Sequence, residues 1–349
     1  MVLPCGKYSV SYDKDMAVIQ TKLQWGLLIA FLAWLFTFPL YVTDYLLYIL
    51  ITMGIILISV LGLNLLTGYC GQISIGQTAF MAVGAYTSSI LCSKIGLSFW
   101  VALPLAGLSA GIVGLIFGAP SVRVKGFYLA MATLAAHFII IYAIMHLGSL
   151  TGGSTGMEAV SPKIGGLVLD GDKKYFYLIM GMVVLMTFIA KNLVRSKVGR
   201  VFIAIRDNDL AAEVMGINIF RYKLLAFFIG CFYAGIAGSL YAHYLTFITS
   251  EHFTLMDSIW QLGMIIVGGL GSIMGAIFGT IFIIGLKEAT IALGPFLSKF
   301  PIFYGGGFGP LGSMLFGLII MLFLIFEPRG INHRWEILKS YYQRWPFSY

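Results

Sequence analysis

Five polar side chains that could form hydrogen bonds with a solute lie close together in an otherwise apolar part of this 349-residue sequence. They fall in, or just before, the glycine-rich segment Thr67–Thr78. Such a segment breaks a membrane helix, and the freed backbone groups and side-chain amides can line a polar path. The same side chains could instead satisfy the broken backbone, and the sequence favours neither alternative. The five candidates are Asn64, Gln72, Ser74, Gln77 and Thr78.

A second candidate site is the charged segment Lys191–Lys223. Apolar residues between Val201 and Met215 recur there at helical spacing, with charged residues on another face. Asp207 or Asn208 can cap a short helix, and Gly216 can end it. Because so short a helix is marginal alone in water, we favour a docking surface for a soluble partner over an ordinary basic loop. The candidate docking residues are Arg200, Ile205, Arg206, Asp207, Asn208, Ala211, Ala212, Glu213, Met215 and Gly216.

Patterns for catalysis and metal binding are missing or misplaced. No Gly-xxxx-Gly-Lys-Ser/Thr loop for nucleotide phosphates occurs. The segment Gly152–Gly156 matches a hydrolase nucleophile pattern, which has meaning only at a strand-to-helix elbow. The four cysteines are scattered, so neither a disulfide framework nor a metal site is indicated. His137 and His243 lie in apolar stretches without the acidic partners of a proton relay, and we expect both to be neutral and hydrogen-bonded. We predict no enzymatic activity and no cofactor in this chain.

The composition places the chain in a membrane. Hydrophobic residues make up 59% of the sequence and charged residues 10%, whereas soluble domains carry about 25% charged residues. The formal net charge of +8 arises from loops and tails, where basic residues determine orientation, and it does not indicate nucleic-acid binding. Residues Met1–Gln20 contain no sustained apolar run, so we expect no secretory signal there.

We therefore predict an all-α polytopic membrane protein with about ten transmembrane helices, some of them broken or re-entrant. Most of the apolar stretches approach the ~20 residues that are needed to cross the hydrocarbon core. Glycines at four-residue spacing, such as Gly107 and Gly111, would let helices approach closely. The expected spans and part-spans are Trp25–Tyr41, Tyr45–Leu66, Ala79–Cys92, Phe99–Ala119, Phe127–Leu147, Tyr175–Ala190, Tyr222–Phe247, Ile259–Val267, the helix after Gly268–Ser272, and Leu311–Phe326.

The distribution of Lys and Arg predicts the orientation of these spans. We expect residues 1–24 and 327–349 to be cytoplasmic segments, and residues 25–326 to form the transmembrane domain with a cytoplasmic docking loop at 191–223. The basic turn at Arg123 and Lys125 then also faces the cytoplasm, and the charge-balanced loop Gly148–Lys174 faces outward. Glycine-rich breaks in Gly71–Ile90 and Gly263–Ile283 suggest an internal repeat, which in transporters points to the substrate path.

Five motifs together resemble the permease subunits of ABC importers for branched-chain amino acids, in particular the LivM type. The resemblance covers roughly Leu61–Ile331. The motifs are Gly62–Phe80 followed by Gly84-Ala-Tyr86, the loop Thr151–Gly156, Gly199–Gly216 followed by Arg221–Leu224, Val267-Gly-Gly-Leu-Gly-Ser272, and Glu327-Pro-Arg-Gly330.

The resemblance implies the fold of an ABC importer permease in a bacterial inner membrane. It also implies a homologous second permease subunit, a periplasmic substrate-binding protein, and two cytoplasmic ATPase subunits that carry ATP and Mg. Such permeases often have a Glu-Ala-Ala-xxx-Gly signature in the docking loop. Here the segment Leu210-Ala-Ala-Glu-Val-Met-Gly216 has leucine in place of the first glutamate, and the usual Leu-Pro is missing. The contact of that glutamate therefore does not carry over to this chain.

Alternatives remain open on mechanism and on substrate. An ion-coupled secondary transporter without an ATPase partner is the second mechanism, although the sparse intramembrane charge and the docking segment favour an ABC permease. The substrate could be a branched-chain amino acid, another amino acid or amide, or urea, because the binding protein is expected to do most of the selecting. The sequence does not show whether the second permease is identical or only homologous.

Overall fold

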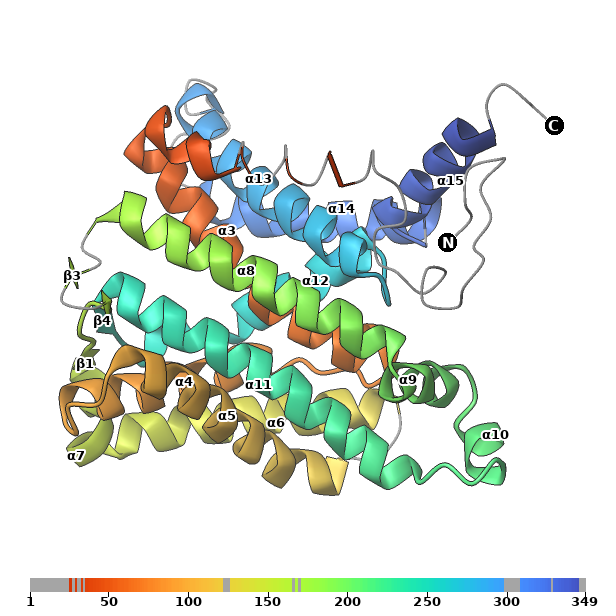
Figure 1. Ribbon diagram of the computed structural model, residues 1–349, viewed down its shortest axis with the longest axis horizontal. Coiled ribbons are helices and arrows are strands. Elements are labelled where there is room, and N and C mark those ends of the chain that lie inside the picture. The colour runs from red at the N-terminus through yellow and green to blue at the C-terminus, as the bar shows by residue number, and fades with distance from the viewer. Residues whose placement is uncertain are drawn as a thin grey trace.

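The long helices of this computed structural model run side by side in a bundle (Figure 1). The structure describes residues 25–26, 29, 33, 35–121, 126–164, 167–168, 171–297, 308–327 and 329–344. The long elements are α3 (Asp44–Leu63), which a π-helix, η2 (Asn64–Tyr69), continues, α4 (Gln77–Ser93), α5 (Phe99–Ser121), α6 (Phe127–His146), α8 (Asp172–Arg195), α11 (Ile219–Leu245), α12 (Leu255–Gly268), α13 (Ile273–Leu297) and α14 (Phe308–Phe326).

Six helices in the described part of the chain are long and apolar enough to cross a membrane, so the chain is a polytopic helical protein as the composition predicts. Their bounds are Asp44–Tyr69, Phe99–Pro120, Tyr128–His146, Asp172–Arg195, Ile219–Leu245 and Ile273–Ala292. These six do not establish the expected count of about ten. At 17 and 14 residues, α4 and α12 are shorter than these six helices and than the ~20 residues of a typical crossing. Residues 27–28, 30–32 and 34 of the expected first span, all of residues 1–24 and the turn at Arg123 and Lys125 lie outside the described residues.

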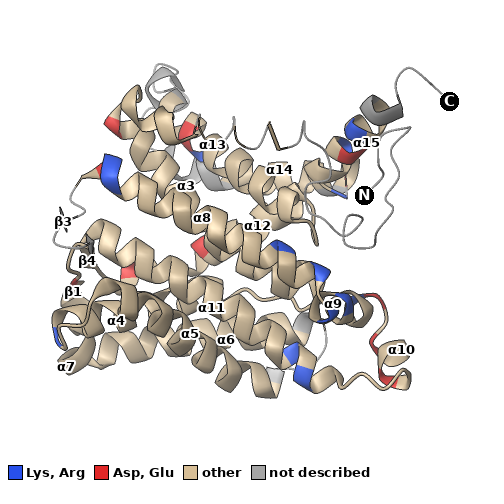
Figure 2. Cartoon of the chain, in the orientation of Figure 1, with Lys and Arg blue, Asp and Glu red and all other residues tan. Residues whose placement is uncertain are grey.

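The two ends of the bundle differ in structure and charge. At one end lie α7 (Gly148–Thr151), the pair β1 (Met157–Glu158) and β4 (Phe247–Ile248), and the pair β2 (Lys163–Ile164) and β3 (Leu167–Val168). At the other lie α9 (Lys197–Asp207), α10 (Asp209–Val214) and α15 (Ile331–Arg344) (Figure 1). Figure 2 shows Lys and Arg gathered near α9, the start of α11 and α15. The positive charge is therefore concentrated at the α9–α10 end.

Two expectations about this end need correction. The segment Lys191–Lys223 is not a loop with one helix, because α8 continues to Arg195 and α11 already begins at Ile219. Only residues 196–218 connect the two long helices, and most of them are helical. The tail after Glu327 also contains a helix, α15, which the sequence pattern had not indicated.

The centre of the bundle is α11, which packs against α3, α4 and α5 through small residues. A Cβ atom added to Gly235 would lie 2.6 Å from the carbonyl oxygen of Ala106 on α5, and one added to Gly84 on α4 would lie 2.2 Å from the carbonyl oxygen of Gly235. On α5, Gly107 faces Phe232 and Gly111 faces Phe228. The prediction of close helix packing through glycines is confirmed.

The two histidines in apolar stretches differ in their partners. The His243 ring lies 2.7 Å from the hydroxyl of Ser88 and 2.6 Å from the carbonyl oxygen of Val160 through its two nitrogens, and it packs edge-on against Phe99. His137 is also buried, but its Nδ1 has no hydrogen-bond partner among the described residues. The expectation of a hydrogen-bonded histidine is therefore confirmed for His243, whereas for His137 no partner of Nδ1 is found.

The packing of α11 predicts that Gly235→Val destabilises the protein. The added side chain must push α5 away from α11, and overpacking of this kind costs about 1–3 kcal/mol. The matched control is Gly181→Val on α8, since nothing lies within 4 Å of a Cβ at that position. We expect a lower midpoint of thermal unfolding for Gly235→Val alone. Equal midpoints for the two variants would contradict the close approach of α5 and α11.

Candidate functional site

The first part of the candidate site is the break between η2 and α4. After Tyr69 the chain runs without helix until α4 begins at Gln77. The Thr67 hydroxyl donates a hydrogen bond to the carbonyl oxygen of Gln72 at 2.9 Å, and the Ile75 N–H donates to the Thr133 hydroxyl on α6 at 3.0 Å. A π-helix such as η2 is rare and is often found at functional sites.

Asn64 joins this break to the glycine-rich break between α12 and α13. Its side-chain amide donates to the carbonyl oxygen of Ser272 at 2.8 Å and accepts from the N–H of Gly271 at 3.0 Å. Gly68 lies so close that an added Cβ would be 2.4 Å from the Gly271 nitrogen. Gly271 itself has a φ of +74°, which favours glycine. Asn64 therefore satisfies backbone groups in the second break.

Gln77 and Thr78 also make hydrogen bonds that support the structure. The Gln77 side chain donates to the carbonyl oxygens of Ser59 on α3 and Gly230 on α11, at 3.2 and 3.1 Å. The Thr78 hydroxyl donates to the carbonyl oxygen of Thr254 at 2.9 Å and lies 2.5 Å from the Ser258 hydroxyl on α12. These contacts fix the first turn of α4 to α3, α11 and α12.

Gln72 and Ser74 are different, because none of their buried side-chain polar atoms has a partner among the described residues, whereas Gln77 lacks a partner only at Oε1. Both amide atoms of Gln72 and the hydroxyl of Ser74 lack a hydrogen bond within the described structure. Buried polar groups are nearly always paired, so these two need a further explanation. Of the five candidates, Asn64, Gln77 and Thr78 thus have structural partners, while Gln72 and Ser74 remain candidates for contact with a solute.

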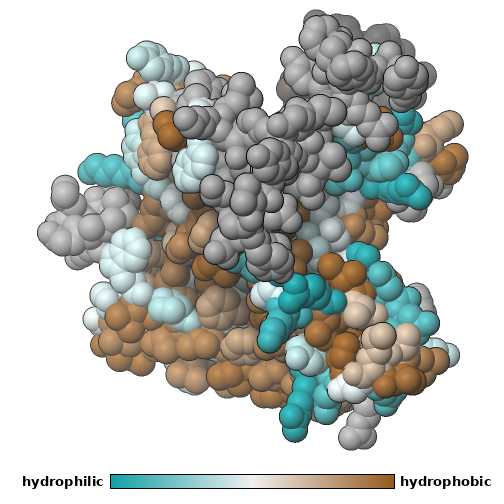
Figure 3. Space-filling view, turned by 45° about the vertical axis from the view of Figure 1, so that its right-hand side comes forward, coloured by the Kyte–Doolittle hydropathy of each residue, from teal (hydrophilic) through white to brown (hydrophobic). Residues whose placement is uncertain are grey.

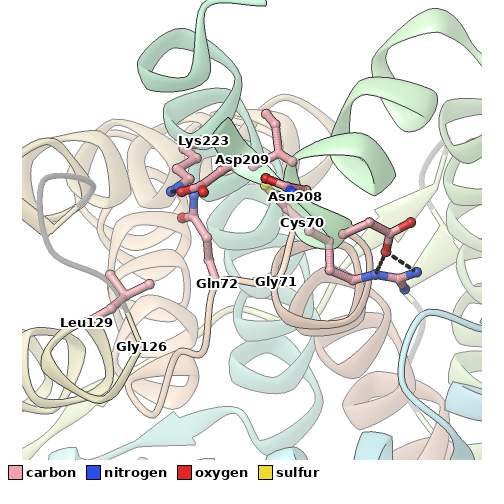
Figure 4. A pocket seen from close by; sticks show the side chains of 11 residues that line it. Cys70, Gly71, Gln72, Gly126, Leu129, Asn208, Asp209 and Lys223 are labelled. Atoms are coloured by element: carbon pink, nitrogen blue, oxygen red, sulfur yellow. Dashed lines mark hydrogen bonds and ion pairs between the residues drawn. The ribbon is translucent and has the colours of Figure 1, made fainter. Parts of the chain in front are cut away.

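Gln72 lines a cavity of about 330 Å³, here called the break pocket. In Figure 4 its side chain points toward Lys223 and Asp209, which lie across the pocket. The Lys223 ammonium is 3.8 Å from an Asp209 carboxylate oxygen. The other residues lining the pocket are Cys70, Gly71, Gly126, Leu129, Ile205, Arg206, Asp207 and Asn208. The break and the predicted docking segment therefore share one cavity.

The second part of the candidate site is the short helix α10, and its ends form as the sequence predicts. Asn208 leaves the helical conformation, and its side chain accepts a hydrogen bond from the Ala211 N–H at 3.1 Å. Gly216 has a φ of +84°. Its N–H donates to the carbonyl oxygen of Glu213, and the Ile217 N–H donates to that of Ala212. These are the two bonds of a Schellman motif, so the predicted caps at Asn208 and Gly216 are confirmed.

The predicted apolar face from Val201 to Met215 is not continuous, because the chain bends at Asn208 into two helices. Ile205 on α9 and Ala212 on α10 are buried within this chain, so they are not exposed to a partner. The exposed apolar side chains of this helix and its C-cap are Leu210, Val214 and Met215, at 65%, 90% and 84% exposure. Figure 3 shows apolar surface beside hydrophilic surface at this end.

The remaining candidate docking residues lie around α10. Arg200, Asp207, Ala211, Glu213 and Gly216 are exposed. Sequence reasoning missed Leu210 and Val214, although their four-residue separation places them on one helix face. It also missed the pairing of Asp209 with Lys223. No local pattern could have indicated that pair, because it depends on the reversal of the chain between α10 and α11.

Arg206 links the docking segment to both breaks. One of its terminal nitrogens donates to the carbonyl oxygen of Gly68 at 3.0 Å, at the end of η2 where a positive charge is favourable. Its other nitrogens donate to the Asp207 carboxylate at 3.0 and 3.1 Å (Figure 4). A Cβ added to Gly271 would lie 2.6 Å from the guanidinium. A displacement of α9 would therefore change contacts at both breaks.

No metal centre is found in the part of the chain that the structure describes. Among those residues, no group of three or more His, Cys, Asp or Glu side chains could hold a metal ion. The polar groups of the site are amides, hydroxyls and two ion pairs, Arg206 with Asp207 and Lys223 with Asp209. Such groups can bind and orient a small polar solute or a protein surface.

Comparison with known proteins identifies what the chain resembles. A family described as the permease component of the branched-chain amino acid transport system matches residues 45–324. The chain is 30% identical over 295 residues to the high-affinity branched-chain amino acid transport system permease protein LivM of Escherichia coli K12, covering 78% of this chain and 66% of that protein. It thus spans just under two thirds of that relative. No solved structure matches the chain.

More distant relatives have related names. The probable branched-chain amino acid transport permease protein LivM of Methanocaldococcus jannaschii is 26% identical over 324 residues, covering 81% of this chain and 92% of that protein. The autoinducer 2 import system permease protein LsrC of Escherichia coli O9:H4 is 26% identical over 152 residues, covering 42% of this chain and 41% of LsrC.

The contacts of Asn64 predict that Asn64→Ala weakens the second break. The N–H of Gly271 then loses its partner, and an unsatisfied buried group costs about 1–3 kcal/mol. We expect a lower midpoint of thermal unfolding and faster amide hydrogen exchange at Gly271. The control is Asn192→Ala at an exposed position of α8. Unchanged exchange at Gly271 in the Asn64 variant would show that the break does not depend on this side chain.

Proposed function

Because this chain belongs to the family of branched-chain amino acid transport permeases, we propose that it forms half of the translocation path of an ATP-driven importer. The observation that carries this proposal is α10, a capped helix whose apolar side chains Leu210 and Val214, with the C-cap residue Met215, are exposed at the positively charged end of the bundle. Soluble partners commonly bind the apolar face of a helix in a groove. The chain itself then carries no ATPase activity.

The partners follow from this assignment. Two cytoplasmic ATPase subunits, which hold ATP and Mg, dock on α10 of this chain and on the equivalent helix of a homologous second permease. A periplasmic binding protein delivers the substrate to the opposite end. The names of the relatives favour branched-chain amino acids as substrates, and other amino acids, amides or urea are the alternatives.

Contacts from α10 to the breaks support a route for the motion of the ATPases. α10 follows α9 directly at Asn208, and Arg206 at the end of α9 holds the carbonyl of Gly68. Asn64 in η2 in turn holds the second break at Gly271 and Ser272. Displacement of α10 by an ATPase would therefore move both breaks together, and with them the unpaired amide of Gln72.

The orientation that fits this function places α9, α10 and α15 in the cytoplasm. The α7, β1 and β4 end then faces the periplasm, and the protein lies in a bacterial inner membrane. Ten crossings result if the six long helices are joined by Trp25–Tyr41, α4, α12 and α14. This arrangement satisfies the positive-inside rule, because the Lys and Arg residues of α9 and α15 lie on the cytoplasmic side.

The exposed face of α10 predicts that Val214→Glu prevents binding of the ATPase. A carboxylate at this position would be buried against the partner without a counter-charge, which is strongly unfavourable. We expect loss of ATPase copurification and at least about a tenfold drop in substrate uptake, which corresponds to about 1.4 kcal/mol. Ala212→Glu is a poorer test, because Ala212 is buried within this chain and the change would disturb α10 itself.

The matched control is Val160→Glu, at an exposed valine on the opposite end of the bundle. It should leave ATPase binding intact. If Val214→Glu retains the ATPase and transports normally, α10 is not the docking helix. If the wild-type complex contains no ATPase at all and uptake follows an ion gradient, the chain is a secondary transporter.

The orientation is tested by cysteine labelling from outside intact cells, in a variant without other accessible cysteines. We expect a membrane-impermeant thiol reagent to label Ser154→Cys, which is exposed at the α7 end, and not Glu213→Cys, which is exposed on α10. Permeabilised cells should label both, as a control for accessibility. Labelling of Glu213→Cys alone in intact cells would reverse the topology.

A further inference from the structure

A second cavity of about 180 Å³ lies among α3, α4, α11, α12 and α13, and we call it the α12–α13 pocket. Thr78 in the first turn of α4 lines this pocket, whereas Gln72 lines the break pocket. Five residues lie between them, and the chain from Gln72 to Thr78 can span at most about 20 Å. The two pockets thus lie near opposite ends of the same broken segment.

One wall of the α12–α13 pocket is apolar and firmly held. Its aliphatic residues are Ile56, Met81, Met264, Ile283 and Ile284. Gln261 fixes this wall, since its side chain donates to the sulfur of Met81 at 3.3 Å and accepts from the Ser59 hydroxyl at 2.8 Å. Trp260 stacks on Phe316 with ring centres 3.9 Å apart. Pockets for drug-sized ligands measure roughly 300–1,000 Å³, so this one fits a smaller solute with an aliphatic part.

The same pocket is also lined by two opposite charges that do not pair with each other. Asp257 on α12 accepts hydrogen bonds from the N–H and the hydroxyl of Thr254, both through one carboxylate oxygen. Lys287 on α13 forms no hydrogen bond or ion pair with any described residue. A charge of each sign therefore remains available beside an aliphatic wall.

We propose that the α12–α13 pocket binds a zwitterionic α-amino acid with an aliphatic side chain. Lys287 pairs with the carboxylate of the ligand, Asp257 pairs with its ammonium group, and the side chain lies against Ile283 and Met264. Three separate features of the ligand are then recognised by three features of the pocket. This inference rests on the proposed function and adds to it, because it makes the permease itself selective rather than a passive channel behind the binding protein.

The position of the α12–α13 pocket has a consequence for the mechanism of transport. The Thr78 hydroxyl lies at the pocket and also holds α12 through Thr254 and Ser258. A ligand in the pocket therefore touches the element whose movement would open a way toward the break pocket. Tyr241, which packs against Phe253 with ring centres 5.9 Å apart, closes the side formed by α11.

The test compares ligands that each lack one charged group. Equilibrium binding of radiolabelled leucine is measured on the assembled transporter in lipid nanodiscs, without binding protein, in competition with leucinol and with 4-methylpentanoate. Leucinol lacks the carboxylate and 4-methylpentanoate lacks the ammonium group. We expect both to bind at least tenfold more weakly than leucine to the wild type. The affinity of Lys287→Gln for leucine should fall to that of the wild type for leucinol. The affinity of Asp257→Asn for leucine should fall to that of the wild type for 4-methylpentanoate.

Matched controls are Lys174→Gln and Glu251→Gln, which change exposed charges on α8 and beside α12 outside the pocket and should bind leucine as the wild type does. Lys287→Arg should restore the preference for leucine over leucinol. Equal binding of the three ligands to the wild type would overturn the proposal, and so would an equal loss of all three in the Lys287 and Asp257 variants.

The outcome is separable from that of the proposed function. With ATPases and a binding protein present, ATP-dependent leucine uptake tests the importer assignment. If uptake occurs but binding shows no dependence on the two charges, the pocket proposal alone fails. If neither uptake nor ATPase association occurs, the importer assignment fails first.

Discussion

The pair of hydrogen bonds between the Asn64 amide and the backbone of Gly271 and Ser272 joins two parts of the chain that are about 200 residues apart in sequence. In a membrane, backbone groups that leave a helix must find partners within the protein. Asn64 lies in η2, which leads into the first break. Its side chain supplies a donor and an acceptor to the second break, between α12 and α13. The two breaks are thereby held in one place, and the arrangement of α3, α4, α12 and α13 around them depends on it.

The arrangement of these helices also depends on glycines, which have no side chain to keep the helices apart. Lipid offers no hydrophobic drive for helices to associate, so close packing of small residues has to hold them together. α11 meets this requirement through Gly235 against Ala106 and Gly84. The packed core of α3, α4, α5 and α11 adjoins the first break, where Asn64, Gln72 and Ser74 are buried.

Features set by neighbouring residues could be predicted from the sequence. The caps of α10 at Asn208 and Gly216 depend on local backbone geometry, and the predicted positions are confirmed. The long apolar spans are likewise determined by local composition. The direction in which Ala212 points depends on the bend at Asn208 and on the packing of α9, so no helical periodicity could show that Ala212 is buried. The same holds for the pairing of Asp209 with Lys223, which requires the return of the chain into α11.

Two alternatives were open for the polar cluster: its side chains line a solute path, or they satisfy the broken backbone. Residue type alone could not separate a side chain that lines a path from one that satisfies a break, because an amide can do both. Contacts separate them: Asn64, Gln77 and Thr78 hold the backbone or neighbouring helices, while the side chains of Gln72 and Ser74 have no hydrogen-bond partner among the residues that the structure describes. The sequence predicts the cluster, and the contacts in the structure divide its members.

The unpaired amide of Gln72 bears on how such a break can change state. Its side chain lines the break pocket together with Asp209 and Lys223, where a polar solute can approach it. Arg206 lines the same pocket and holds the end of η2 through the carbonyl oxygen of Gly68. A displacement of α9 would therefore act both on the break and on the pocket that Gln72 lines.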